Sequence, residues 1–285
     1  MAIMKPGSPV LQPGVVSAGI QLAFPAYEGS GRSSSDLSGN GNTGTFNGGT
    51  AAAPGVTWTA GQSGWTWKFN GTSGYVTTPG QPYAFGKNNF TFAWTEFRTS
   101  NANGKVAIGA STLSSGSAGY QGFLFGYSSG GANLLAYMSS ALTAWDIVSG
   151  TSLGAVTLNA WNTFHITRNG STFVAYKNGV QTSTWSSSAA VYASTGSLDI
   201  GQYNQGSGTL SYFTGNMENV RIFNFPMSQS QILQDLIDPY AYCRTKNRQL
   251  WKSKAIAGRV CSPFGSPIIS LNPVGPSVIH GRVVA

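Results

Sequence analysis

Charge is scarce in this chain. Charged residues make up 8% of its 285 residues, against roughly a quarter in an average soluble domain. With so few charges, the surface must be kept polar by Ser, Thr, Asn, Gln and Gly, a composition that suits short strands and many turns. The shortage therefore excludes a charged helical bundle and a disordered acidic or basic chain.

Cysteine and histidine are scarce as well. The two cysteines, Cys243 and Cys261, form no metal-binding pattern and cannot build a disulfide framework, so we expect two free thiols. The two histidines, His165 and His280, lie in no nucleophile or metal-helix motif. We expect His165, on the polar face of its predicted strand, to be a surface or hydrogen-bonded residue.

Long apolar runs are missing too. No stretch reaches the roughly 18 apolar residues that a membrane span needs. Residues 1–14, MAIMKPGSPVLQPG, have proline, glycine and serine where a secretory signal has an apolar run. We therefore expect a chain that is made in a cytoplasm, without export and without a membrane partner.

The acidic residues argue against an enzyme. A glycosidase needs two carboxyl groups held within several ångströms, commonly on alternate positions of one strand. The eight acids of this chain share no strand face: Glu28, Asp36, Glu96, Asp146, Asp199, Glu218, Asp235 and Asp238. Asp235 and Asp238 are close in sequence, but they fall at a helix end before a proline, where we expect solvent-exposed side chains. We predict no catalytic residue, although a pair assembled from distant strands stays open.

Alternating apolar residues predict strands through most of the chain. GWTWKFNG, residues 64–71, and NNFTFAWTEF, residues 88–97, each place most of their aromatic side chains on one face. Residues 161–184, WNTFHITRNGSTFVAYKNGVQTST, contain Asn169-Gly170 and Asn178-Gly179. Because Asn-Gly favours two-residue hairpin turns in which both central residues have positive φ, this stretch predicts a three-stranded meander.

A strand and then a helix close the predicted domain. In residues 215–232, GNMENVRIFNFPMSQSQI, we expect one face to carry Met217, Asn219 and Arg221 and the other to carry Glu218, Val220 and Ile222. Pro226 ends the strand, and Ser228 with Gln231 forms a capping box. The helical spacing of the apolar residues predicts that the helix packs on the β-domain through Ile232, Leu233, Leu236 and Ile237.

The order of five motifs resembles the concanavalin A-like jelly-roll proteins of the laminin G-like type. These motifs are DLSGNGNTGTFNGG from 36, WKFNGTSGYVTTP from 67, FTFAWTEFRTS from 90, WNTFHITRNGSTFVAYKNGV from 161 and FTGNMENVRIFNFPMSQSQI from 213. The resemblance covers about residues 22–237. It implies an all-β sandwich of two antiparallel sheets, with one short closing helix and extended N- and C-terminal arms. We place the arms at residues 1–21 and 241–285 and the jelly-roll domain at 22–240.

Many relatives bind carbohydrate, and some hold calcium near a carboxylate. Where relatives often carry acids after the second strand, this chain has Asn70, Thr72 and Ser73. The calcium candidates that are left are Asp36, Asn40 and Asn42. A calcium site usually has six or more oxygen ligands and more than one carboxylate. We therefore expect no cofactor, and we expect these three side chains to hold their own loop by turn hydrogen bonds; bound calcium is the alternative.

Carbohydrate binding would use aromatic planes and amides on loops. The candidates are Trp145, Asp146, Tyr203 and Asn204, which lie among turn residues. For Trp145 a place in the core is an equal alternative. Fold alone does not decide between binding and other roles.

The C-terminal segment carries nearly all of the net charge. Residues 1–240 contain nine Lys or Arg and eight Asp or Glu, whereas residues 241–285 contain seven Lys or Arg and no acid. The basic run includes Arg244, Lys246, Arg248, Trp251, Lys252 and Lys254, and it resembles the ends of laminin G-like proteins encoded in bacteriophage genomes. Isoleucine and valine are frequent in the following residues, and apolar surface of that extent needs a partner.

We therefore expect a non-enzymatic structural protein of a bacteriophage virion, first of all a capsid decoration protein that its terminal arms attach. The expected partners are other virion proteins and copies of the chain itself, with a host glycan as a further candidate and no nucleic acid. The alternatives are a tail or fibre protein that binds host glycan, and a bacterial carbohydrate-binding or glucanase module.

Overall fold

Two eight-stranded antiparallel sheets make up most of the described chain. The computed structural model describes residues 19–79, 82–100, 106–110, 122–193, 196–204, 210–241, 259–261 and 267–269. It divides into two compact units, residues 1–244 and 245–285. In the second unit the described residues form a hairpin of β19 (Arg259–Cys261) and β20 (Pro267–Ile269). The predicted arm residues Arg244, Lys246, Arg248, Trp251, Lys252 and Lys254 lie outside the described residues, as do Cys243 and His280.

Sheet A has the strand order β14-β13-β12-β7-β18-β5-β4, and β1 also pairs with β18. Its strands are β1 (Ile20–Phe24), β4 (Val56–Ala60), β5 (Trp65–Asn70), β7 (Phe90–Arg98), β12 (Trp161–Asn169), β13 (Thr172–Lys177), β14 (Val180–Ser186) and β18 (Thr214–Phe223). The first half of β18 pairs with β5 and its second half pairs with β1, while β7 runs along the other side.

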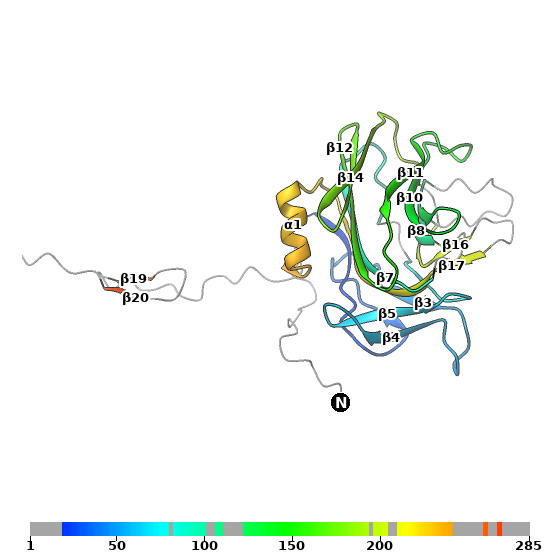
Figure 1. Ribbon diagram of the computed structural model, residues 1–285, viewed down its shortest axis with the longest axis horizontal. Coiled ribbons are helices and arrows are strands. Elements are labelled where there is room, and N and C mark those ends of the chain that lie inside the picture. The colour runs from blue at the N-terminus through cyan, green and yellow to red at the C-terminus, as the bar shows by residue number, and fades with distance from the viewer. Residues whose placement is uncertain are drawn as a thin grey trace, which may run out of the picture. The chain divides into compact units, whose positions relative to one another are not determined.

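Sheet B has the order β11-β10-β9-β8-β15-β6-β3-β2. Its strands are β2 (Ser33–Ser34), β3 (Gly44–Asn47), β6 (Tyr75–Thr77), β8 (Val106–Ala110), β9 (Phe123–Tyr127), β10 (Asn133–Met138), β11 (Val148–Ala155) and β15 (Leu198–Ile200). A separate small hairpin joins β16 (Gln202–Asn204) to β17 (Leu210–Tyr212). The predicted sandwich of two antiparallel sheets is confirmed (Figure 1).

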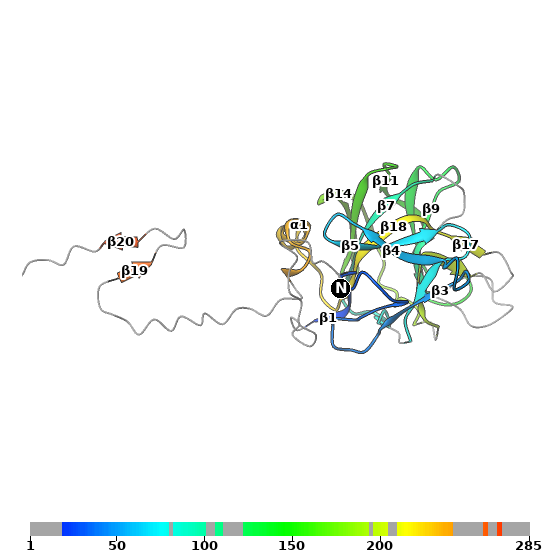
Figure 2. The same cartoon turned by 90° about the horizontal axis from the view of Figure 1, so that it is seen from below.

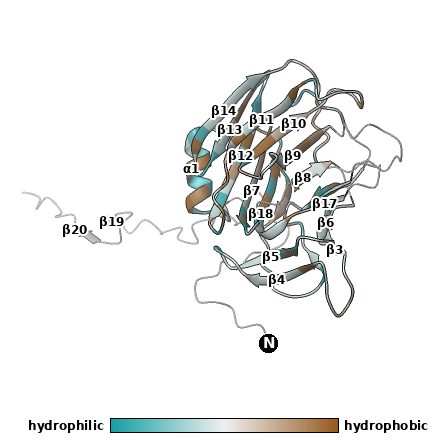
Figure 3. Cartoon of the chain, turned by 45° about the vertical axis from the view of Figure 1, so that its right-hand side comes forward, coloured by the Kyte–Doolittle hydropathy of each residue, from teal (hydrophilic) through white to brown (hydrophobic). Residues whose placement is uncertain are grey.

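Aromatic side chains fill the space between the sheets. Phe92 of β7 lies 4.8 Å from Phe123 of β9, and Trp94 stacks on Phe125 at 5.3 Å, both measured between ring centroids. Figure 3 shows hydrophobic and hydrophilic residues along the strands of both sheets and on the helix. Burial of the inward-facing aromatic residues is the main stabilising contribution, because each removes a large apolar area from water.

The predicted three-stranded meander is present as β12, β13 and β14. Its second turn is as expected, since Asn178 and Gly179 have φ of 48° and 78°. The first turn differs: Asn169 pairs with Thr172, so the two central residues are Gly170 and Ser171, and of these only Gly170 has positive φ. A turn with glycine first and a single positive φ is the other common two-residue hairpin.

Strand β18 does not alternate as predicted. Its register with β7 shifts between Glu218 and Arg221, and Asn219 has a φ of 55°. This β-bulge places Met217 in the core together with Val220 and Ile222, although the alternating pattern had put Met217 on the opposite face from these two residues. A bulge adds a residue to one strand and re-aims the side chains beside it.

Helix α1 (Gln229–Ile237) begins with the predicted capping box of Ser228 and Gln231. It lies on the side of sheet A away from sheet B (Figures 1 and 2). Its buried face contains Ile232, which belongs to a cluster with Ala93, Tyr176 and Phe223. The predicted apolar face is partly wrong, because Leu233 and Ile237 are 46% and 81% exposed while Asp235 is buried. Among the described residues, no helix is long and apolar enough to span a membrane.

Candidate functional site

The outer face of sheet A carries three parallel rows of side chains that cross the strands. The helix-covered row contains Arg221, Ala93 and His165 on β18, β7 and β12. The floor row contains Glu218, Thr95 and Thr163 on the same strands. The open row contains Asn216, Phe97 and Trp161. Because α1 covers one row only, the next row becomes the floor of a cavity.

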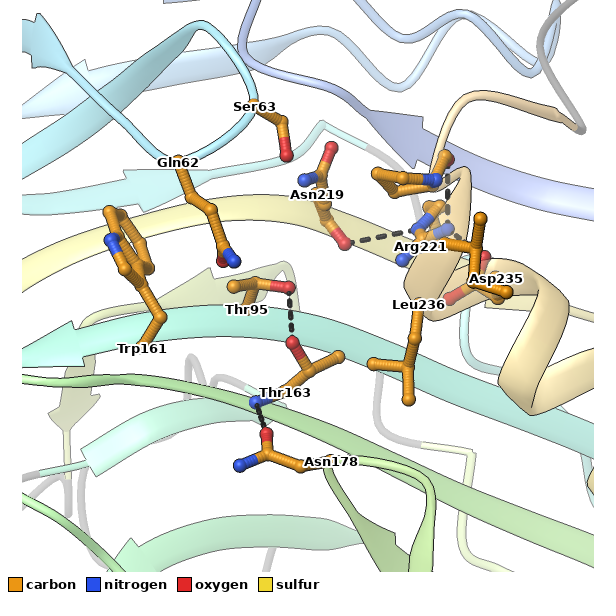
Figure 4. A pocket seen from close by; sticks show the side chains of 12 residues that line it. Gln62, Ser63, Thr95, Trp161, Thr163, Asn178, Asn219, Arg221, Asp235 and Leu236 are labelled. Carbon is orange, nitrogen blue, oxygen red and sulfur yellow. Dashed lines mark hydrogen bonds and ion pairs between the residues drawn. The ribbon is translucent and has the colours of Figure 1, made fainter.

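This cavity has a volume of about 450 Å³. Its lining residues are Gln62, Ser63, Thr95, Trp161, Thr163, Asn178, Asn219, Arg221, Asp235, Leu236, Ile237 and Pro239. Figure 4 shows Trp161 at one end and the Arg221–Asp235 pair at the other, with Thr95 and Thr163 between them. The walls are the β4–β5 turn, the β13–β14 turn and the end of α1.

The bulge in β18 places Asn219 in the cavity lining. Asn219 is 1% exposed, and its Nδ2 donates a hydrogen bond of 3.3 Å to Glu218 Oε1. Its Oδ1 has no hydrogen-bond partner among the described residues. A non-glycine residue in the left-handed region carries backbone strain, and such strain is concentrated at functional sites. The strained backbone thus holds a buried amide oxygen at the cavity.

Glu218 fastens the β4–β5 turn to the floor. Its carboxylate accepts hydrogen bonds from the backbone N–H groups of Gln62 at 3.1 Å and Ser63 at 3.2 Å. Burial raises the pKa of Glu218 to about 7, although the hydrogen bonds from Ser63 and Gln62 and the charge of Arg221 oppose the rise. Desolvation of a carboxylate outweighs a few hydrogen bonds at such a position.

A buried cluster of three polar side chains forms the other wall. Asp235 of α1 lies against Arg221 through Oδ1 and against His165 through Oδ2, the latter at 2.7 Å. The small side chain of Ala93, between Arg221 and His165 in the helix-covered row, leaves room for the carboxylate. The expectation that Asp235 is solvated is therefore wrong, whereas the hydrogen-bonded alternative for His165 is confirmed.

The protonation of this cluster follows from burial and charge. Burial lowers the pKa of His165, and Asp235 opposes this only in part, so His165 is neutral at physiological pH. Burial raises the pKa of Asp235, but the Arg221 guanidinium and the hydrogen bond with His165 outweigh it and hold that pKa below its usual value. The cluster is an ion pair with a neutral imidazole beside it.

The lining combines an indole, amides and hydroxyls. Trp161 packs against Phe97 with 5.4 Å between ring centroids and is half-buried. The Oγ1 atoms of Thr95 and Thr163 lie 3.0 Å apart, and Asn178 Oδ1 accepts the Thr163 N–H at 2.7 Å. Such a set suits a ligand with many hydroxyl groups and one apolar face. No group of three or more His, Cys, Asp or Glu side chains that could hold a metal occurs in the described part of the chain.

Residues 70–233, more than half of the chain, match the model of the concanavalin A-like lectin/glucanases superfamily. The chain belongs to this superfamily. No curated protein gives a significant sequence match. The bacteriophage origin suggested by the resemblance stays a prediction.

Several solved structures of known proteins have a similar fold. Domain 4 of AbnA, an extracellular arabinanase of Geobacillus stearothermophilus in complex with arabinotriose, is 15% identical, with a TM-score of 0.56 over 76% of this chain and 98% of that domain. A sialidase of Trypanosoma rangeli is 17% identical, with a TM-score of 0.58 over 85% of this chain and 37% of the sialidase. The binding domain of Paraclostridial Mosquitocidal Protein 1 is 13% identical, with a TM-score of 0.56 over 78% of this chain and 53% of that chain. These similarities to sialidase, arabinanase and toxin-binding domains show the concanavalin A-like fold.

The carbohydrate-binding residues that we predicted lie away from this cavity, at sheet B. Trp145 packs against Tyr137 with 5.6 Å between ring centroids, and both contact a cluster that contains buried Tyr203. Asp146 is exposed and accepts the Ser140 N–H at 2.7 Å. Asn204 ends β16, and its side chain lies outside the described residues. Trp145 and Tyr203 are thus brought together, but on the other sheet of the concanavalin A-like domain.

The calcium candidates hold their own loop. The Asp36 carboxylate accepts the backbone N–H groups of Ala23, Ser38 and Asn42 at 3.0, 2.9 and 3.0 Å. Asn40 and Asn42 donate to the Gln21 carbonyl at 3.1 and 3.2 Å. These contacts fix the loop to β1, and bound calcium at this loop stays an untested alternative.

Proposed function

We propose that this concanavalin A-like domain is a non-enzymatic glycan-binding module and that the cavity on sheet A is its binding site. The observation that carries the proposal is the lining itself, with an indole at one end and hydroxyls and amides along the floor and walls. A cavity of about 450 Å³ is large enough for one or two sugar rings. The arabinotriose complex of the AbnA domain, which has the same fold, supports the class of ligand.

The carboxylates near the cavity favour binding over hydrolysis. Asp235 is held by Arg221 and His165, and Glu218 is held by the backbone of the β4–β5 turn. A glycosidase needs one carboxyl group as an acid and another as a nucleophile or base on either side of the scissile bond. Because both groups are already engaged in fixing the walls, we propose no catalytic role for either, and we expect no sugar release from glycans.

The test compares two half-buried tryptophans on a glycan array. We expect Trp161→Ala to lose at least tenfold in affinity, because stacking of a sugar on the indole is lost. Trp145→Ala, on the other sheet, is the matched control and should bind as the unchanged protein does. Loss of binding in Trp145→Ala alone would move the site to the residues that we predicted from sequence. Absence of any glycan signal from the folded, unchanged protein would refute the function.

We propose in addition that the C-terminal residues 241–285 attach the domain to a virion. The division of the chain between Arg244 and Thr245 supports a separate role for this segment, since the sandwich and α1 are complete before it. Display on a capsid is our first choice, and a place on a tail or fibre that contacts host glycan is the second.

A further inference from the structure

The charges around the cavity are few, and they offset one another. Among the described lining residues Arg221 is the one cation, and it is paired with Asp235. Glu218 adds a second carboxyl group under the floor, and His165 is neutral because burial lowers its pKa. Lys68 pairs with Asn216 in the open row, but it lies on β5 and does not line the cavity. The net charge at the cavity is therefore zero or negative at neutral pH.

Two buried polar atoms of the lining have no hydrogen-bond partner among the described residues. They are Asn219 Oδ1, which can only accept a hydrogen bond, and Arg221 Nη2, which can only donate one. A hydroxyl group can donate or accept a hydrogen bond, so ligand hydroxyl groups suit the acceptor Asn219 Oδ1 as well as the donor Arg221 Nη2. An ionised carboxylate can only accept hydrogen bonds, so it cannot satisfy the amide oxygen of Asn219.

We propose that the cavity binds uncharged sugars and rejects sugars that carry a carboxylate, such as uronic acids and sialic acids. This inference rests on the glycan-binding function proposed above and adds the class of ligand. Two observations support it. Asp235 already compensates Arg221, the one cation among the described lining residues, and Glu218 adds a carboxyl group under the floor, so these residues offer an added carboxylate no uncompensated positive charge. The hydroxyls and amides of the lining, with the unpaired Asn219 Oδ1 and Arg221 Nη2, suit ligand hydroxyl groups. Rejection of the wrong charge is a common source of specificity at such sites.

The experiment uses the full chain and a glycan array of matched pairs. Neutral hexose and pentose oligosaccharides are printed beside counterparts that end in a uronic acid or a sialic acid. We expect the signal on neutral members to exceed that on their acidic counterparts by roughly tenfold or more. Repulsion between the carboxylate of the sugar and one carboxylate of a partly buried site should give an effect of this size. Equal or stronger binding of acidic members would overturn the inference and leave the glycan-binding function standing. Absence of signal on both kinds would overturn both.

Two isosteric variants test the cause of the rejection. Asp235→Asn leaves the Arg221 charge uncompensated, and Glu218→Gln removes the carboxylate under the floor while keeping an oxygen for the turn. We expect each folded variant to reduce the neutral-over-acidic ratio by several-fold. Asp146→Asn, which removes an exposed carboxylate beside sheet B, is the control and should leave the ratio unchanged. An unchanged ratio in both Asp235→Asn and Glu218→Gln would refute the electrostatic cause.

Discussion

Two buried glutamates stand on neighbouring strands of sheet A and face opposite sides of it. Glu218 lies under the cavity floor, whereas Glu96 points into the core, where Trp94 Nε1 and Tyr127 Oη donate to its Oε2 at 2.9 and 2.8 Å. Burial raises the pKa of each to about 7. Between pH 4.5 and 7 the unfolded chain ionises these groups before the folded chain does. The free energy of unfolding should therefore fall as the pH rises through this range and level off above it.

Replacing Glu218 should remove its share of this pH dependence. We expect Glu218→Gln to gain about 2–3 kcal/mol in unfolding free energy relative to the unchanged protein when the pH is raised from 5 to 8. The physical reason is that glutamine pays no cost for an ionised buried carboxylate. Urea denaturation at the two pH values measures the difference. A difference between variant and parent that does not change with pH would contradict the raised pKa of Glu218.

Asp235 shows what the sequence could and could not tell at this scale. Its place before Asp238-Pro239 indicated a solvated helix end, which was wrong. Helical spacing does contain the signal, because Asp235 lies three residues after Ile232 and one before Leu236, on the face that packs on sheet A. The partners Arg221 and His165 come from strands far apart in the chain, and no local pattern brings them together.

At the scale of elements, most strands and the helix were predicted correctly, because the sequence signals for them are local. The capping box of Ser228 and the Asn178-Gly179 turn depend on residues a few positions apart, so their backbone geometry is fixed by nearby side chains. The cavity was not predicted, because its lining residues come from segments that are distant in the sequence. Its lining joins a β4–β5 turn, a bulge in β18, the start of β12 and the end of α1. The alternating residues of β18 contain no sequence signal that predicts the bulge at Asn219.

Strand β18 approaches β7 closely at Gly215, where we expect a single added methyl group to have a strong effect on stability. Gly215 has a φ of 138°, and a Cβ there would lie 2.2 Å from the Phe97 carbonyl oxygen. We expect Gly215→Ala to lower the unfolding free energy by roughly 3 kcal/mol, from backbone strain and overpacking together.

The matched control for this substitution is Gly170→Ala. Gly170 also has positive φ, at 61°, but a Cβ there would meet no atom within 4 Å. Gly170→Ala should therefore lower the unfolding free energy by roughly 1 kcal/mol, from backbone strain alone. Urea denaturation of the two variants gives the comparison, and equal losses would show that the approach of β18 to β7 is not tight.

At the scale of the whole molecule, the chain separates into a complete sandwich and a basic C-terminal segment. The sandwich buries its apolar residues without the segment, since both sheets and α1 end by Ile237. The fold class could be predicted from the order of motifs, because that order reports the succession of strands. The role of residues 241–285 stays a prediction that rests on composition.

Removal of residues 241–285 should separate folding from attachment. We expect the shortened chain to unfold at the same temperature and to keep its glycan-array profile, but not to join virions. To distinguish the kind of contact, Trp251→Ala is compared with a variant in which Arg244, Lys246 and Arg248 are neutralised, across a range of salt. We expect the Trp251→Ala variant to be lost from virions, because buried aromatic residues contribute strongly to the binding energy of protein interfaces. Detachment of the charge variant alone, with DNA binding by the free segment, would instead indicate a nucleic-acid contact.

The position of β18 has a consequence for synthesis. It is the last strand of sheet A in the chain, yet it lies in the middle of that sheet, between β7 and β5 and against β1. While the ribosome has not yet made β18, each of these three strands presents an unpaired edge that other nascent chains can join. Sheet A can close only when translation has passed Phe223, so its assembly depends on contacts distant in sequence and should be slow. A chain that stalls before this point is exposed to aggregation through the same edges that β18 later covers.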